Sequence, residues 1–75
     1  MSHVAESAID LSLVDQIVAR HGTSADMAIP ILQEMQERYG YLPAEALRHL
    51  AETTDCTPAQ IYGIVTFYSQ LRLSP

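Results

Sequence analysis

The chain has 75 residues, enough for a single domain, and nine acidic residues against four arginines give it a formal charge of -5. Such a surface repels phosphate backbones and anionic lipid headgroups, and the apolar runs are only a few residues long, so we expect neither nucleic-acid binding nor membrane insertion. Residues 1–10 have neither the basic start nor the apolar stretch of a signal peptide, which favours a cytoplasmic location.

The first predicted helix covers residues 11–21 and follows an N-terminus, residues 1–9, that we expect to be flexible. Asp10 or Ser12 can cap this helix, because a short polar side chain accepts a hydrogen bond from the free N–H groups of the first turn. Gly22 ends it, since glycine readily takes the left-handed conformation found at helix C-termini. One face carries apolar residues at helical spacing: Leu13, Val14, Ile17 and Val18.

The second predicted helix covers residues 24–39 and stops at Gly40. Pro30 conflicts with a regular helix because it lacks an N–H and crowds the carbonyl four residues back. We therefore expect an irregular first turn, or a helix proper that starts near Ile29. Its apolar stripe consists of Ala28, Ile31, Leu32, Met35 and Tyr39, and its wet side carries Glu34, Glu37 and Arg38.

The third predicted helix covers residues 43–54, with Pro43 at the first helical position, where proline is tolerated. The fourth covers residues 58–71. Thr57 lies just before it and Gln60 lies in its first turn, and the pair matches a capping box, in which each side chain bonds the other's backbone N–H. The third helix buries Leu47, Leu50 and Ala51, and the fourth presents Ile61, Ile64, Val65, Tyr68 and Leu71 on one stripe.

Four short helices joined by short loops predict an all-α, compact bundle over residues 10–75. Gly63 lies inside the fourth helix, where glycine costs ~1 kcal/mol relative to alanine. We interpret it as a place where another backbone of the fold comes close.

No catalytic or cofactor site is apparent in the residue pattern. Cys56 is the single cysteine and reads as a small, half-buried apolar residue, because an iron–sulfur cluster needs about four cysteine ligands. Glu34 and Glu37 read as solvated charges rather than as an acid–base pair. The three histidines show no metal-ligand spacing and suit surface or capping roles: His3, His21 and His49.

Two functional alternatives arise from the helix pattern. Residues 50–65 have the order of a DNA-binding helix-turn-helix, with small Ala51 before the turn, but no lysine or arginine occurs between Cys56 and Leu71 to meet phosphates. An acyl carrier protein is also small, acidic and helical, yet its Asp-Ser-Leu attachment motif is absent, because residues 10–13 read DLSL. Both alternatives are disfavoured.

The fourth helix carries a candidate docking face. Aromatic side chains bury large apolar areas and anchor interfaces. The face could instead pack on the first helix of the same chain, and both possibilities are open at the level of sequence. Its residues are Tyr62, Gly63, Thr66 and Phe67.

Two segments carry a family resemblance. Residues 31–43, ILQEMQERYGYLP, and residues 61–70, IYGIVTFYSQ, are similar to helices of the thioredoxin-like [2Fe-2S] ferredoxin subunits found in NAD(P)-reducing hydrogenases, respiratory complex I and NAD-dependent formate dehydrogenases. The resemblance extends over residues 13–75. In that family a helical N-terminal domain precedes a thioredoxin-like domain that binds one [2Fe-2S] cluster through four cysteines.

The resemblance implies that this chain is a non-catalytic part of an electron-transfer subunit. Its partners would be its own thioredoxin-like domain and a flavin-bearing NAD(P)H-oxidising subunit, in a hydrogenase or an NADH dehydrogenase. The sequence stops before the family's four cysteines, and Cys56 matches none of them, so we expect a chain truncated before the [2Fe-2S] domain, with no cofactor bound to its own residues.

Overall fold

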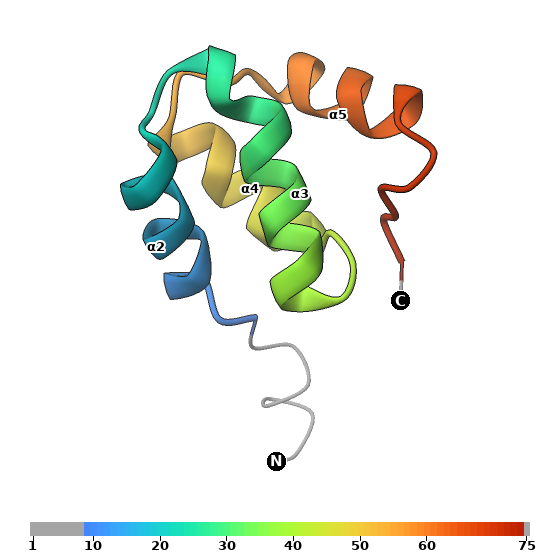
Figure 1. Cartoon of the computed structure of the whole chain (residues 1–75), viewed down its shortest axis with the longest axis horizontal. Helices are drawn as coiled ribbons and strands as arrows, with labels where there is room; N and C mark the ends of the chain where they lie inside the picture. Colours follow the sequence, from blue (N-terminus) through green and yellow to red (C-terminus); the bar gives the residue numbers. More distant parts are fainter. Residues whose placement is uncertain (1–8, 75) are drawn as a thin grey trace.

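The computed structural model describes residues 9–74, and within that range it contains four α-helices, one 3-10 turn and no strand. The all-α prediction is confirmed. Residues 1–8 of the predicted flexible N-terminus lie outside the described residues, whereas Ile9 packs against the core. The elements in chain order are α2 (Ser12–His21), η1 (Ala25–Met27), α3 (Ala28–Tyr39), α4 (Ala44–Thr53) and α5 (Pro58–Phe67) (Figure 1).

One hydrophobic core joins all four helices. Helix α2 packs against both α3 and α4, and α5 packs against α4. Figure 1 shows α5 crossing one end of the bundle, on the side away from α2. Burying each large aliphatic side chain contributes about 1.5–3 kcal/mol, which is the main source of stability in so small a domain. The side chains with at most 2% exposure are Val14, Ile17, Ala28, Ile31, Leu32, Met35, Leu42, Ala46, Leu47, Leu50, Cys56 and Ile61.

The first helix begins and ends close to the predicted residues. Asp10 accepts hydrogen bonds from the backbone N–H of Ser12, at 3.1 Å, and from the Ser12 hydroxyl. At the other end Gly22 has a φ of 96° and donates its N–H to the carbonyl of Val18 at 2.6 Å. The positive φ explains why glycine follows the helix, because a side chain is strained in that conformation.

The irregular start predicted around Pro30 is confirmed. The short turn η1 comes first, and the Ser24 hydroxyl caps it by accepting from the N–H of Asp26 at 3.2 Å. Helix α3 then begins at Ala28, so Pro30 is its third residue. The N–H groups of a first helical turn have no partner within the helix, and proline's missing N–H is therefore tolerated there.

The last helix is shorter than predicted. It ends at Phe67 rather than Leu71, and Tyr68 takes an extended conformation with φ of -96° and ψ of 109°. The chain then turns back, and this reversal brings Leu71 into the core, where it is 7% exposed.

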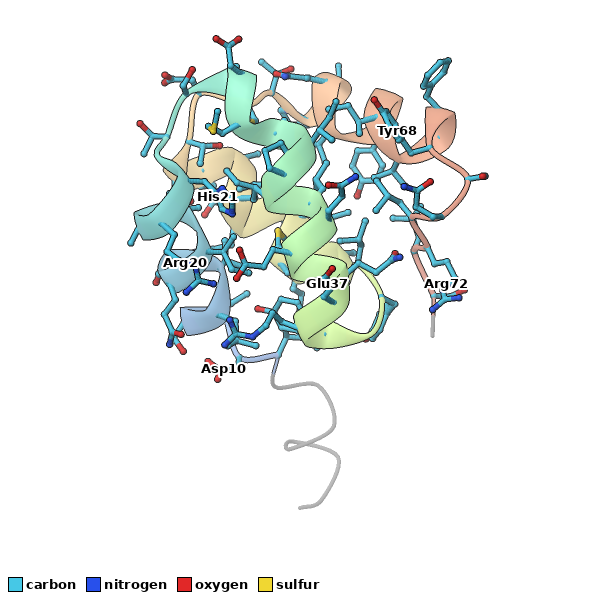
Figure 2. The ribbon with its side chains drawn as sticks, in the orientation of Figure 1. Asp10, Arg20, His21, Glu37, Tyr68 and Arg72 are labelled. Carbon is cyan, nitrogen blue, oxygen red and sulfur yellow. The ribbon has the colours of Figure 1, made fainter. Side chains whose placement is uncertain are left out.

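Residues 68–74, which we call the C-terminal strap, are held against α3 and the turn that follows it. The Gln36 side chain donates to the carbonyl of Gln70 and accepts from the N–H of Arg72 at 2.6 Å. The carbonyl of Arg72 in turn accepts from the N–H of Leu42 at 2.7 Å. Figure 2 shows Arg72 on this strap, below Tyr68 and beside α3. The strap thus adopts a defined path without being helical.

Three local predictions need correction. No atom lies within 4 Å of a Cβ built on Gly63, so no other backbone of the fold approaches this glycine. Thr57 does cap α5 by accepting from the N–H of Gln60 at 3.1 Å, but the Gln60 side chain donates to the carbonyl of Ala25 instead of completing a capping box. Ala51 is half-buried rather than buried, because it borders a surface groove.

Candidate docking surface

The four residues of the candidate docking face all lie on the exposed side of α5. Tyr62 is 42% exposed and Phe67 is 82% exposed, and Gly63 and Thr66 are exposed between them. The inner side of α5 is formed by Ile61 and Val65, which are buried. Because its side chain is exposed, Phe67 does not pack on the first helix of the same chain. Its ring forms an edge-type contact with the ring of Tyr68, at a centroid distance of 5.5 Å.

Helix α5 carries no charged residue on any side. Its sequence, PAQIYGIVTF, contains neither Asp, Glu, Lys nor Arg. A helix that is apolar on all sides is normally buried on all sides, whereas a surface helix has charges on its outer face. The outer face of α5 thus has the composition of a covered surface while it remains open to solvent in the single chain.

A shallow groove of about 230 Å³ runs beside this face. It lies where α4 and α5 meet, and most of its walls are apolar. Tyr62 belongs both to the groove and to the exposed face, so the two form one continuous surface. The groove is lined by Leu47, Arg48, Ala51, Pro58, Ile61 and Tyr62.

Three exposed carboxylates lie on the segments that adjoin the N-terminal end of α5. Asp55 lies in the turn before the helix, and Glu52 is in the last turn of α4. Asp26 follows Ala25, whose carbonyl accepts a hydrogen bond from the Gln60 side chain at 3.1 Å. Within residues 9–74 none of these three carboxylates takes part in an ion pair. One end of the uncharged face is consequently acidic.

A polar cluster that the sequence reading missed joins α2 to α3. Glu34 was interpreted as a solvated charge, but its carboxylate is half-buried and contacts Arg20, lies 2.9 Å from Nε2 of His21, and lies 3.5 Å from Arg38. Figure 2 shows Arg20 and His21 projecting from α2 toward α3. Only the spacing of Glu34 and Arg38 by four residues signalled part of this cluster.

A second histidine–carboxylate pair joins α2 to α4. Nε2 of His49 lies 2.8 Å from Oδ1 of Asp15, and the two residues are on neighbouring helices. Together with the cluster at Glu34, this pair fixes α2 at both of its ends. Their partners are side chains of the same bundle, so both groups stabilise helix packing and neither faces the docking surface.

Tyr39 is the titratable group that its surroundings perturb most clearly. Burial raises the pKa of its phenol above the ordinary value, and the negative charge of Asp10 raises it further. The hydroxyl donates to the backbone carbonyl of Asp10 at 2.5 Å. The neutral phenol therefore ties the end of α3 to the segment before α2.

A family model supplies the identification: the model of the thioredoxin-like [2Fe-2S] ferredoxin matches residues 14–75. This chain belongs to that family. It is also similar to the NADP-reducing hydrogenase subunit HndA of Solidesulfovibrio fructosivorans, with 34% identity over 47 residues. That match covers 63% of this chain and 28% of the relative, so the chain spans less than a third of the relative's length within the match. The resemblance stated from residues 31–43 and 61–70 is confirmed.

The family's cluster does not fit the residues of this chain. A [2Fe-2S] cluster is held by four ligands, mostly cysteine thiolates. Cys56 is the one cysteine in the sequence, and its side chain is 2% exposed in the core beneath the turn before α5. Among the described residues no group of three or more His, Cys, Asp or Glu side chains could hold a metal ion. Cys56 acts as an apolar core residue.

The described helices also bear on two questions from the sequence analysis, membrane insertion and DNA binding by a helix-turn-helix. None of them is long and apolar enough to span a bilayer. Helices α4 and α5 are in contact, but α5 presents an aromatic, uncharged face where a recognition helix needs polar and basic side chains. The face therefore suits a protein surface better than a DNA groove.

Proposed function

We propose that this chain is the helical docking domain of an electron-transfer iron–sulfur subunit in an NAD(P)-linked oxidoreductase complex. An NADP-reducing hydrogenase is the parent that the relative's name supports, and an NADH dehydrogenase is the other candidate. The domain itself catalyses no reaction and works in the cytoplasm. In this proposal a thioredoxin-like domain of the same subunit holds the [2Fe-2S] cluster after which the family is named.

The observation that carries the docking role is the exposed, uncharged face of α5. An aromatic ring that is 82% exposed, as in Phe67, places a large apolar area in water. Contiguous exposed apolar surface on a small domain marks an interaction site, and aromatic residues supply much of the binding energy in interfaces. The neighbouring groove offers a cavity of about 230 Å³ for a partner's side chain.

The partner that we propose is the flavin-bearing NAD(P)H-oxidising subunit. An electron-transfer domain has to be held near the flavin that supplies its electrons, and a rigid helical domain beside it can provide that attachment. The thioredoxin-like domain of the same subunit is the second partner that we propose for this helical domain.

The test is the affinity of the 75-residue chain for the purified flavin-bearing subunit, measured by titration calorimetry. We expect Phe67→Ala to weaken binding about tenfold or more, which corresponds to about 1.4 kcal/mol, while the melting temperature stays unchanged because the ring is outside the core. Leu73→Ala is the control, since Leu73 is an exposed apolar residue, at 47%, that lies outside α5.

Two results would contradict the proposal. Equal affinities for the wild type and Phe67→Ala would remove α5 from the interface, and absence of wild-type binding would remove the partner. Retention of the chain on duplex DNA at physiological salt would support the helix-turn-helix reading instead.

A further inference from the structure

Gly63 has no explanation within the fold. Its φ is not positive, so its backbone conformation is open to any residue. Apart from its chain neighbours and the adjacent backbone of α5, a Cβ added to it would meet no atom within 4 Å, so internal packing does not require glycine either. Glycine in a helix interior is nevertheless destabilising relative to alanine. Glycine at this exposed position can therefore serve only the contact with a partner molecule.

The residues one turn away on the same face define the shape of this surface. Ala59 precedes Gly63 by four residues and Phe67 follows it by four, so all three lie on one side of α5, and all three are exposed. The face is consequently flat along Ala59 and Gly63 and is closed at its C-terminal end by a protruding ring. We call this flat strip of surface, from Ala59 to Gly63, the track. Because it lacks large side chains, another backbone can approach it closely.

The charges around this track indicate the chemistry of its occupant. The track itself is uncharged, whereas its N-terminal end is bordered by Asp26, Glu52 and Asp55, none of which is in an ion pair within residues 9–74. Arg48 is the cation nearest to the groove. A complementary surface is apolar in the middle and basic at one end.

We propose that the partner covers α5 with a helix of its own, whose backbone packs closely at Gly63 and whose Lys or Arg residues lie over Asp26, Glu52 and Asp55. This inference rests on the proposed docking function and specifies the geometry and charge of the interface. A second copy of this chain fits poorly, because it contains no lysine and brings the same charge of -5.

The first experiment fills the track. Gly63→Leu is compared with Ala19→Leu, which adds similar bulk at an exposed position on α2. Because the space around Gly63 is open, we expect both variants to fold with melting temperatures no lower than that of the wild type. Binding of the flavin-bearing subunit should fall at least about tenfold in Gly63→Leu and stay unchanged in Ala19→Leu, because the added side chain separates the two helices.

The second experiment tests the charges through association kinetics. The double variant Glu52→Gln/Asp55→Asn should associate more slowly and lose part of its salt dependence, because rim charges act mainly on the association rate. Glu37→Gln/Glu45→Gln removes the same charge at the opposite ends of α3 and α4 and should associate like the wild type.

The outcomes separate this inference from the docking function. If Phe67→Ala weakens binding while Gly63→Leu binds like the wild type, the close helix contact is wrong and the docking role stands. If the two charge variants associate equally fast, the basic border of the partner is wrong. If the wild type does not bind, both proposals fall.

Discussion

Substitution of Gln36 should release the C-terminal strap without unfolding the bundle. The Gln36 amide makes two hydrogen bonds with the strap, one to the carbonyl of Gln70 and one from the N–H of Arg72 at 2.6 Å. Gln36→Ala removes both. Each such bond contributes about 0.5–1.5 kcal/mol net, so loss of both should make opening of the strap easier by about 1–3 kcal/mol. That change multiplies the population of the open strap by about 5–160.

Native-state hydrogen exchange measures this opening directly. The reporting amides are those of Arg72, which bonds Gln36, and Leu42, which bonds the carbonyl of Arg72 at 2.7 Å. Both should exchange about 5–160 times faster in Gln36→Ala, whereas amides inside α2 should change little at the same denaturant concentration.

Gln33→Ala is the matched control. Gln33 is exposed on α3, one turn before Gln36. Like Gln36, it lines a polar groove between α3 and the strap, next to Leu71. Its loss should leave both strap amides protected as in the wild type. If Gln36→Ala also leaves their exchange unchanged, burial of Leu71 and the bond between Leu42 and Arg72 hold the strap without Gln36, and the role assigned to Gln36 is refuted.

Three further predictions concern stability, pH and cofactor content. Gly63→Ala should stabilise the fold by about 1 kcal/mol and raise the melting temperature by about 4–8 °C, because open space surrounds the site. Gly40→Ala should instead lower the melting temperature, since Gly40 has a φ of 88°, which strains any other residue. The raised pKa of Tyr39 means that the unfolded chain loses its phenolic proton first, so stability should fall as pH rises above 10.0, and Tyr39→Phe should reduce this loss in urea unfolding at alkaline pH. Iron–sulfur reconstitution of this chain should give no visible absorption, and a stable chromophore would contradict the assignment of Cys56 to the core.

The elements of this protein follow closely from local signals. Gly22 and Gly40 end their helices with positive φ, and Thr57 caps α5, because each of these effects depends on one residue and its immediate neighbours. Most of the apolar stripes of α2 and α3 also becomes the core as predicted, since the helical period decides which side chains share a face, but Leu13 and Tyr39 are only half-buried. The aromatic residues of α5 marked a candidate docking face, but the sequence left open whether that face packs on the first helix, and the structure shows that Phe67 is 82% exposed.

Other features depended on tertiary structure because their partners are distant in the chain. Gln36 and Arg72 are far apart in sequence, and no local sequence pattern indicates the hydrogen bond between them. Glu34 became half-buried only when α2 brought Arg20 and His21 beside it. The end of α5 at Phe67 and the open space around Gly63 were likewise settled by where the strap and the other helices lie. Helical period and capping are local properties, whereas these contacts exist only after the helices have packed.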